Sequence, residues 1–197
     1  MYLDLIKIKN CALFGGTFDP FHNGHLHLIK SLVSTNRFER FVVVPAGDPY
    51  QKASPVSAKD RFAMTALALH GEAVTVSDCE IRRTGPSYAI DTVEEIAGIF
   101  PAERYTWILG SDAFAGIQEW HRFEELAKMV DFLVVTRPGA EKVKDIPGVR
   151  FEIVEIGAPD ISSTDLRSRI GKGEEVSSLI PDAVIDYIKG NGLYGAA

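Results

Sequence analysis

The fold is decided by residues 11–25, CALFGGTFDPFHNGH, where a short apolar run meets two glycines and a polar turn before a helical pattern begins. Residues 11–14 are apolar and stop at Gly15 and Gly16, which predicts a buried β-strand. From about Gly24 to Thr35 the apolar residues recur on one face, which predicts a helix. A strand, a glycine turn and a helix in this order are typical of the first unit of a parallel α/β sheet.

The same alternation of short apolar runs and amphipathic stretches continues, and it predicts a Rossmann-like, doubly wound parallel sheet with two helices closing the chain. The further strands are predicted at 41–44, 74–77 with an extension towards 81, 105–109, 132–135 and 151–156. The further helices are predicted at 57–69, from Asp91 to the residue before Pro101, at 163–170 and at 181–189. Residues 45–56 and 138–149 are the least regular, and we expect the first to be an active-site loop.

The composition is that of a globular protein, because 197 residues with 46% hydrophobic and 24% charged can bury one core. We therefore predict a single domain over residues 1–197, with its motifs between 11 and 194. No apolar run reaches the roughly 18 residues of a membrane span, and no signal-peptide pattern opens the chain. Two isolated cysteines favour a reducing cytoplasm, and a single disulfide between them stays open.

The turn after the first strand suits an anionic ligand, although the net charge of −6 argues against a general nucleic-acid binder. Gly15 and Gly16 let a ligand approach the backbone, and the N-terminus of the next helix favours a phosphate. His22 and His25 are three residues apart, so on a first helical turn they lie on the same side. Two imidazoles there can donate hydrogen bonds to a phosphate oxygen and stabilise charge on a departing pyrophosphate.

Two other interpretations of this segment remain. The first is a turn followed by polar helix-capping residues. The second is a transition-metal site with His22, His25 and His27 as ligands, together with Asp19. His27 comes two positions after His25 and points elsewhere on a helix, which disfavours the metal site. The chain has none of the Walker, Gly-x-Gly-x-x-Gly or Gly-x-Ser-x-Gly patterns, so any phosphate must use another loop.

A second polar cluster opens the predicted helix at 163–170. Ser162, Ser163 and Arg167 place hydroxyl groups and a guanidinium near a helix start, where they can hold a polyphosphate. Taken alone, Ser162 and Asp165 fit a variant capping arrangement better.

Further candidate ligand-binding residues stand singly at or beyond the ends of other predicted strands. Gly110 and Asp112 follow a buried strand, and Asp112 either accepts hydrogen bonds from a ribose or caps the next helix. Trp120 offers an aromatic plane to a pyridine ring, although a tryptophan is more often a core residue. Lys52 and Arg137 lie on predicted loops at the ligand end of the sheet, where cations matter only if an anion binds nearby.

The ordered set of these segments resembles the bacterial nicotinate mononucleotide adenylyltransferases of the HxGH nucleotidyltransferase superfamily. The segment 15–25 matches the family's Gly-Gly-Thr-Phe-Asp-Pro-x-His-x-Gly-His at every fixed position. The other matching segments are Asp60–Met64, Gly85–Tyr88 with Asp91 and Thr92, Gly110 and Asp112 with Trp120, Phe132–Gly139, Ile161–Arg167 and Pro181–Tyr194. The resemblance therefore covers residues 11–194.

The resemblance implies that AMP passes from ATP to nicotinate mononucleotide, with Mg²⁺ held by the ATP phosphates rather than by the protein. The products are nicotinate adenine dinucleotide and pyrophosphate, in NAD biosynthesis. The implied catalytic residues are His22, His25 and Arg167. The implied ATP-binding residues are Gly15, Gly16, Thr17, Phe18, His22, His25, Gly110, Asp112, Ile161, Ser162, Ser163 and Arg167. The implied mononucleotide-binding residues are Lys52, Ser87, Tyr88, Trp120 and Arg137.

Two departures from the family pattern keep the acceptor open. Residues 47–52 read Gly-Asp-Pro-Tyr-Gln-Lys where many members have Pro-Pro-His-Lys, and Ala89 stands where the family usually has threonine. A hydroxyl near the pyridine carboxylate is therefore missing, so the sequence does not decide between nicotinate mononucleotide and nicotinamide mononucleotide as the acceptor. Three alternatives remain. The chain could use phosphopantetheine as the acceptor, it could be a non-catalytic nucleotide-binding module, or it could be a metal-dependent hydrolase. The sequence favours small-molecule substrates over nucleic acid or membrane, and it leaves a homo-oligomer open.

Overall fold

A six-stranded, all-parallel sheet forms the centre of the computed structural model, which describes residues 8–50, 54–136, 139 and 142–196. Its strand order is β3-β2-β1-β4-β5-β6. The strands are β1 (Ile8–Gly16), β2 (Arg40–Pro45), β3 (Thr75–Val76), β4 (Ala102–Gly110), β5 (Val130–Thr136) and β6 (Phe151–Glu155). The chain thus has the predicted doubly wound parallel α/β fold.

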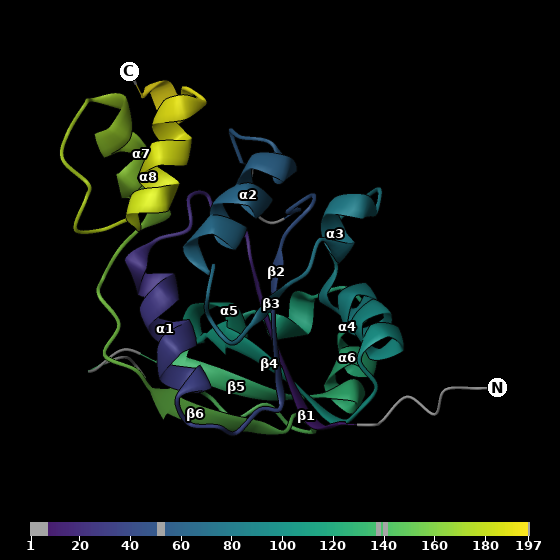
Figure 1. Ribbon diagram of the computed structural model, residues 1–197. Coiled ribbons are helices and arrows are strands. Elements are labelled where there is room, and N and C mark those ends of the chain that lie inside the picture. Colours follow the sequence, from purple (N-terminus) through teal and green to yellow (C-terminus); the bar gives the residue numbers. More distant parts are fainter. Residues whose placement is uncertain (1–7, 51–53, 137–138, 140–141, 197) are drawn as a thin grey trace.

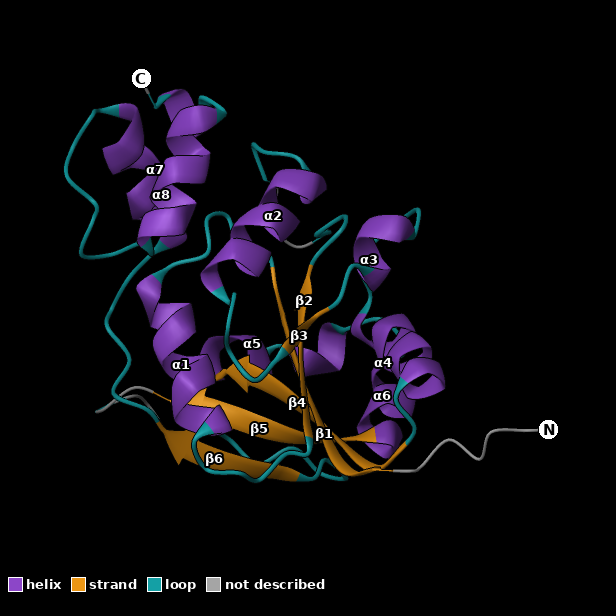
Figure 2. Ribbon diagram, in the orientation of Figure 1, coloured by secondary structure: helices purple, strands orange, loops and turns teal. Residues whose placement is uncertain are grey.

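Helices cover both faces of this sheet, with α1 on one face and α4 and α6 on the other (Figures 1 and 2). The helices are α1 (Asn23–Val33), α2 (Ala58–Ala68), α3 (Cys79–Arg82), α4 (Ala89–Ile99), α5 (Ser111–Ala115), α6 (Phe123–Met129), α7 (Ser163–Gly171) and α8 (Asp182–Gly190). Two short 3₁₀ turns, η1 (Ile117–Glu119) and η2 (Leu193–Gly195), complete the elements. No helix in the part of the chain that the structure describes is long and apolar enough to cross a membrane.

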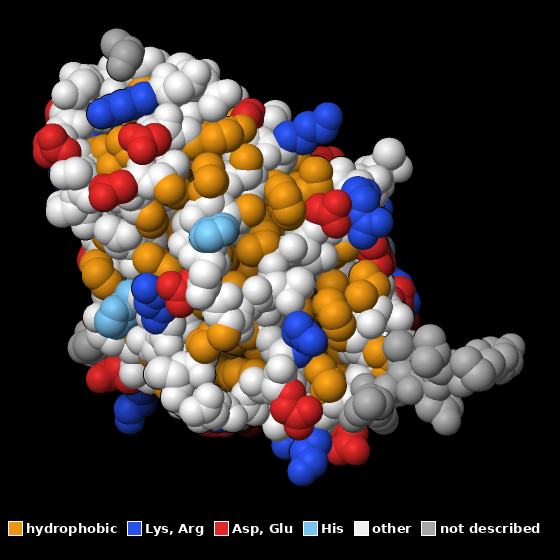
Figure 3. Space-filling view, viewed as in Figure 1, with side chains coloured by type: hydrophobic (Ala, Val, Ile, Leu, Met, Phe, Trp, Pro, Cys, Tyr) orange, Lys and Arg blue, Asp and Glu red, His pale blue; other side chains and the backbone are white. Residues whose placement is uncertain are grey.

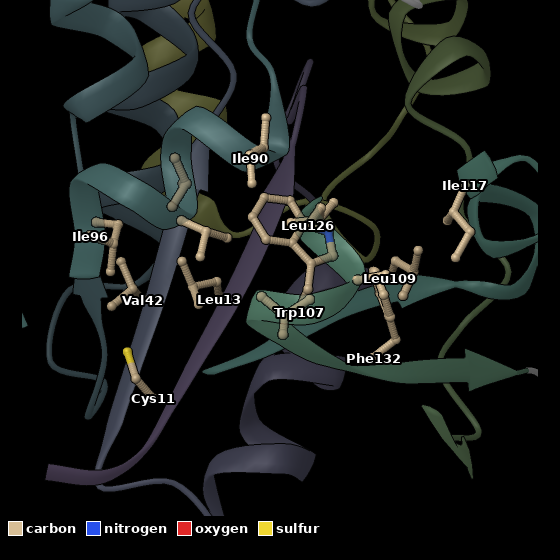
Figure 4. Packing of buried hydrophobic residues seen from close by; sticks show 14 of the residues in the cluster. Cys11, Leu13, Val42, Ile90, Ile96, Trp107, Leu109, Ile117, Leu126 and Phe132 are labelled. Carbon is tan, nitrogen blue, oxygen red and sulfur yellow. The ribbon is translucent and has the colours of Figure 1, made fainter. Parts of the chain in front are cut away.

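The central strands are apolar on both sides because they are covered on both sides. Leu13 and Trp107 point to the face of α4, where they pack with Ile90 and Ile96 (Figure 4). The alternate residues of the same strands pack against α1, Phe14 among them. This period of two distributes one apolar run between two cores.

A third apolar cluster joins the C-terminal helices to α2. Met64 of α2 is buried there with Leu166, Val184 and Ile188 from α7 and α8, and the hydroxyl of Tyr187 donates to Asp60 Oδ1 at 2.9 Å. Figure 3, viewed from the same side as Figure 1, shows hydrophobic side chains at the surface along the middle of the molecule. The charged side chains on this side lie mostly towards its edges. The C-terminal helices are therefore attached through α2 rather than directly to the sheet.

Three parts of the predicted pattern are wrong. The segment towards Ile81 is a two-residue strand followed by α3, because Ser77 Oγ accepts the N–H of Cys79 and begins a turn. The helix predicted from Asp91 begins at Ala89, since an acidic residue is favourable throughout a first turn and does not mark the cap. Between 111 and 129 the sequence predicts at most one helix capped by Asp112, whereas the structure has α5, η1 and α6 there, with Gly110 at the N-cap of α5, because these elements are too short to show a period.

Candidate active site

A cavity of about 290 Å³ opens at the carboxyl ends of β1 and β4, the edge where parallel α/β sheets bind ligands. Six of the predicted site residues line it, namely Gly15, Gly16, Thr17, Ser87, Gly110 and Trp120. The other lining residues are Phe14, Ala46, Pro49, Tyr50, Glu80, Ala89, Trp107, Leu109 and Ala113. The structure therefore joins predicted nucleotide-binding and mononucleotide-binding residues in one wall.

A larger cavity, of about 600 Å³, lies near the opposite end of the sheet. Its charged side chains mostly neutralise one another, since Arg37 pairs with Glu152 at 2.6 Å and Arg150 pairs with Asp131. We place no chemistry there, because size alone does not make a site and these ions are already paired.

The two glycines at the end of β1 make room for aromatic rings of the protein itself. A Cβ on Gly15 would lie 2.9 Å from Cζ2 of Trp107, and one on Gly16 would lie 2.7 Å from the ring of Phe18. Phe18 is buried and has a left-handed backbone, with φ of 51°. Alanine at either glycine would therefore displace a ring that shapes the cavity or the turn beside it.

His22 and His25 stack on each other at the start of α1, with ring centroids 3.6 Å apart and planes 21° from parallel. The backbone N–H of His22 donates to His25 Nδ1 at 3.2 Å, so the neutral His25 ring carries its proton on Nε2. The predicted placement of both imidazoles on one side is confirmed. Gly24 between them leaves little space for a side chain, because a Cβ there would lie 3.1 Å from the His22 ring and 3.2 Å from the Pro159 carbonyl oxygen.

The turn before His22 is held from the C-terminal helices. Asp19 is 3% exposed, and its Oδ1 accepts the hydroxyl of Tyr194 at 2.6 Å. Arg167 donates from Nη1 to the Asp19 carbonyl oxygen at 2.8 Å, and Ser163 Oγ donates to the Pro20 carbonyl oxygen at 3.2 Å. Arg167 and Ser163 thus reach the predicted phosphate loop, although their hydrogen bonds in this structure are to the protein.

Arg61 of α2 joins the turn after β1 to the loop after β2. Its Nη1 donates to the carbonyl oxygens of Thr17, at 3.0 Å, and Ala46, while Nη2 donates to that of Gly47 at 3.0 Å. Burial lowers the pKa of this guanidinium, and the nearby Asp19 opposes that shift. Since Arg61 is only 1% exposed, it shapes the site without reaching into it.

Ser87 holds the loop after β2 from the other side. Its Oγ accepts the N–H groups of Gly47 at 2.9 Å and Asp48 at 3.1 Å. Tyr88, which follows it, stacks on the exposed His121 with centroids 4.1 Å apart and does not line the cavity. Trp120 does line it, and meets Trp107 edge to face at 6.2 Å. Of this predicted group, Ser87 and Trp120 therefore line the cavity.

The remaining predicted residues lie outside that cavity. Asp112 is exposed in the first turn of α5, and Ile161 is buried in the C-terminal apolar cluster, so Ile161 can offer a ligand little more than its backbone. Ser162 occupies the N-cap position of α7, as the capping interpretation expects, but its side chain makes no capping hydrogen bond. Lys52 and Arg137 lie outside the described residues.

Several residues that organise the site have no predicted role, above all Arg61, Ser54, Glu80 and Tyr194. One signal for Arg61 exists in the sequence, because it lies three positions before Met64 and so falls on the apolar stripe of α2. An arginine in register with buried residues needs hydrogen-bond acceptors, and the carbonyl groups of two loops supply them.

Comparison with known proteins gives consistent results. A family model described as cytidylyltransferase-like matches residues 13–169. The chain is 40% identical over 193 residues to a probable nicotinate-nucleotide adenylyltransferase of Acidothermus cellulolyticus, covering 93% of each chain. It is 39% identical over 184 residues to a Streptomyces coelicolor protein of the same description, covering 91% of this chain and 98% of that one.

A solved structure shares the fold. It is described as Plasmodium falciparum nicotinic acid mononucleotide adenylyltransferase complexed with NaAD, and it superposes with a TM-score of 0.79 at 20% identity. The match covers 96% of this chain and 98% of that one.

Proposed function

We propose that this chain, which belongs to the cytidylyltransferase-like family, is a nicotinate-nucleotide adenylyltransferase of NAD biosynthesis, as its relatives at about 40% identity are described. The observation that carries the proposal is the stacked pair His22 and His25 at the start of α1. The pair comes six residues after Gly16, the last residue of β1, and the ring centroid of His25 is 6.5 Å from that of Phe14, which lines the cavity.

The reaction is a single displacement at phosphorus. A 5′-phosphate oxygen of nicotinate mononucleotide attacks the α-phosphorus of ATP, and the bond from that phosphorus to the bridging oxygen breaks. Pyrophosphate leaves with the electron pair, and the other product is nicotinate adenine dinucleotide. No group of the protein becomes covalently bound, so catalysis consists of positioning and charge stabilisation.

The phosphates of ATP belong at the start of α1. His22 and the Nε2–H of His25 donate to them there, and the helix N-terminus adds its own partial positive charge. Arg167 completes the group from α7 once it releases part of its contact with the Asp19 loop. The backbone around Gly15, Gly16, Thr17, Phe18, Ile161, Ser162 and Ser163 lies alongside, and Gly110 and Asp112 take the adenosine side.

The mononucleotide belongs in the cavity. Trp120 offers a ring face to the pyridine, and the Ser87 hydroxyl, with both acceptor positions used by the Gly47 and Asp48 N–H groups, keeps its proton to donate to a carboxylate. Lys52 and Arg137 remain predicted phosphate contacts, and Tyr88 a predicted neighbour of the ring.

Mg²⁺ enters with ATP and neutralises charge on the triphosphate. The phosphate oxygens hold it, because the carboxylates of Asp19 and Glu80 beside the site are already in hydrogen bonds with protein groups. Among the residues that the structure describes there is no group of three or more His, Cys, Asp or Glu spaced to hold a metal. Metal analysis of the purified protein tests the metal-dependent hydrolase, which predicts tightly held zinc or iron.

Two alternatives differ from the proposal in what they predict. Another adenylyltransferase of the superfamily would use phosphopantetheine or nicotinamide mononucleotide as the acceptor. A nucleotide-binding module would bind ATP and release no pyrophosphate. His22, His25 and Arg167 lie close to one loop, where they can serve either binding or charge stabilisation, and the release of pyrophosphate distinguishes the two.

Isotope transfer tests the proposal directly. Purified protein is incubated with nicotinate mononucleotide, magnesium and ATP labelled in either the α- or the γ-phosphate. We expect α-label in the dinucleotide product and γ-label in pyrophosphate. Label from the γ-position in the dinucleotide, or ATP binding without either product, would contradict it.

A further inference from the structure

Glu80 of α3 is the one charged residue among the described residues that line the cavity at the ends of β1 and β4. It is 6% exposed, so the protein encloses its side chain almost completely. Thr92 Oγ1 lies 2.5 Å from Oε1 of this carboxylate and 3.2 Å from the Tyr88 carbonyl oxygen, so its proton goes to Glu80. No described residue donates to the other oxygen, Oε2, which therefore remains for a group of a ligand.

The described cations do not neutralise this carboxylate. Glu80 has no ion pair within 4.0 Å in the part of the chain that the structure describes. Arg61 interacts with it electrostatically, but the same guanidinium also interacts with Asp19 and Asp48, and its hydrogen bonds go to backbone carbonyl oxygens. One cation among three carboxylates leaves these surroundings negative, so this part of the cavity favours positive charge.

Aromatic rings form other walls of the same cavity. Trp107, Trp120 and Tyr50 line it together with Glu80, and the two tryptophans meet edge to face at 6.2 Å. The face of an aromatic ring carries partial negative charge and attracts a cation. Aromatic walls beside a carboxylate therefore suit a flat or bulky cation, including one whose nitrogen has no hydrogen to donate.

We propose that Glu80 is a specificity-determining residue that recognises the positive charge of the pyridinium ring. The ring nitrogen of nicotinate mononucleotide is bonded to the ribose and carries a formal positive charge, whereas a neutral ring of the same shape has none. The carboxylate of the ligand is attached to a different ring atom, where the Ser87 hydroxyl can meet it. This inference rests on the proposed function, because it places the mononucleotide in this cavity.

A pair of ligands isolates the ring charge. The first is nicotinate mononucleotide, and the second is the C-riboside 5′-phosphate whose ring is a neutral meta-carboxyphenyl group. The second ligand keeps the flat ring, the carboxylate and the phosphate of the first. Calorimetry gives the dissociation constant of each with the wild-type protein. We expect the neutral ligand to bind about 3- to 30-fold more weakly, the scale of a desolvated contact between a cation and its recognition group.

Glu80→Gln removes the charge and keeps a side-chain oxygen that can accept the Thr92 hydroxyl. The variant should bind nicotinate mononucleotide more weakly and the neutral ligand about as well as wild type does. The ratio of the two dissociation constants should therefore fall at least about 3-fold. Glu80→Asp, which keeps the charge, should retain a higher ratio than Glu80→Gln.

Glu95→Gln is the matched control. Glu95 accepts from Arg83 at 3.5 Å, and Arg83 also donates to Thr92 at 3.1 Å, so Glu95 belongs to the network that holds Glu80. It does not line the cavity. A disturbed network or a long-range effect of net charge would change the ratio alike in both glutamine variants, whereas we expect Glu95→Gln to keep the wild-type ratio.

The failures of the two claims can be told apart. Wild-type protein that forms no dinucleotide from nicotinate mononucleotide contradicts the proposed function. Normal turnover together with equal affinity for the charged and the neutral ligand overturns only the role of Glu80, as does Glu80→Gln that keeps the wild-type ratio. The wild-type comparison needs no variant, so it tests the inference even if Glu80→Gln does not fold.

Discussion

We propose that His22 supplies one of the charge-stabilising donors of the reaction. Replacing it with alanine should lower turnover by about 10²- to 10³-fold, the usual loss for one charge-stabilising donor, with the fold retained. Steady-state pyrophosphate release measures the turnover, and circular dichroism shows whether the fold is retained.

His27→Ala is the matched control for this variant, because His27 lies on the same helix but is exposed and belongs to none of the residues implied to bind ATP or the mononucleotide. It should keep near-normal turnover. Equal losses in the two variants would remove His22 from the mechanism.

Trp120 tests the mononucleotide side. Trp120→Ala should weaken nicotinate mononucleotide binding by about 5- to 100-fold, the range for losing one aromatic stacking partner, and leave the KM for ATP nearly unchanged. Trp120→Phe keeps a ring and should retain most of the affinity. An unchanged KM for the mononucleotide in the alanine variant would exclude stacking.

At the scale of elements, the loop after β2 depends on one close approach. A Cβ on Gly47 would lie 2.0 Å from the Glu80 carbonyl oxygen, so Gly47→Ala must push the loop away from α3. We expect a loss of about 1–3 kcal/mol in the free energy of unfolding. The variant should also bind the mononucleotide more weakly. Denaturant unfolding measures the loss of stability, and calorimetry measures the loss of affinity.

Gly98→Ala provides the comparison. Gly98 lies in α4, and nothing is within 4 Å of a Cβ placed there. The substitution should stabilise the protein by about 0.5–1 kcal/mol and leave binding unchanged. A Gly47→Ala variant as stable as wild type would contradict the packing described for this loop.

The sequence predicts the long elements well, and the site only in part. β1, α1 and β5 have apolar periods that local patterning reveals, and their predicted bounds agree with the structure within a few residues. Asp19 and Arg61 act through partners 14 to 175 positions away in the chain, Tyr194 and the Thr17 carbonyl oxygen among them, and no local period reports such contacts.

Around the cavity, too, the sequence reveals local features but not the contacts between distant residues. Gly15 and Gly16 are recognisable as a turn, but the rings that require them, Trp107 and Phe18, are visible only in three dimensions. Ser162 has the residue type of a helix cap and yet makes no capping bond, because residue type gives a preference and not a geometry.

For the whole molecule, we propose that the chain folds as one unit. Ala68 at the end of α2 packs against both the α1 core and the C-terminal cluster, so these parts share an apolar contact. Tryptophan fluorescence, which reports the α4 core, and far-ultraviolet circular dichroism should give the same unfolding midpoint. A separate earlier transition seen only by circular dichroism would show that α7 and α8 unfold independently.

The acceptor preference tests the central claim most directly. The ratios of kcat/KM are measured with ATP, magnesium and, in turn, nicotinate mononucleotide, nicotinamide mononucleotide and phosphopantetheine, by pyrophosphate release. The proposed function predicts the highest value for nicotinate mononucleotide, because the Ser87 hydroxyl and the start of α4 favour a carboxylate. An equal or higher value for either of the other acceptors would contradict it.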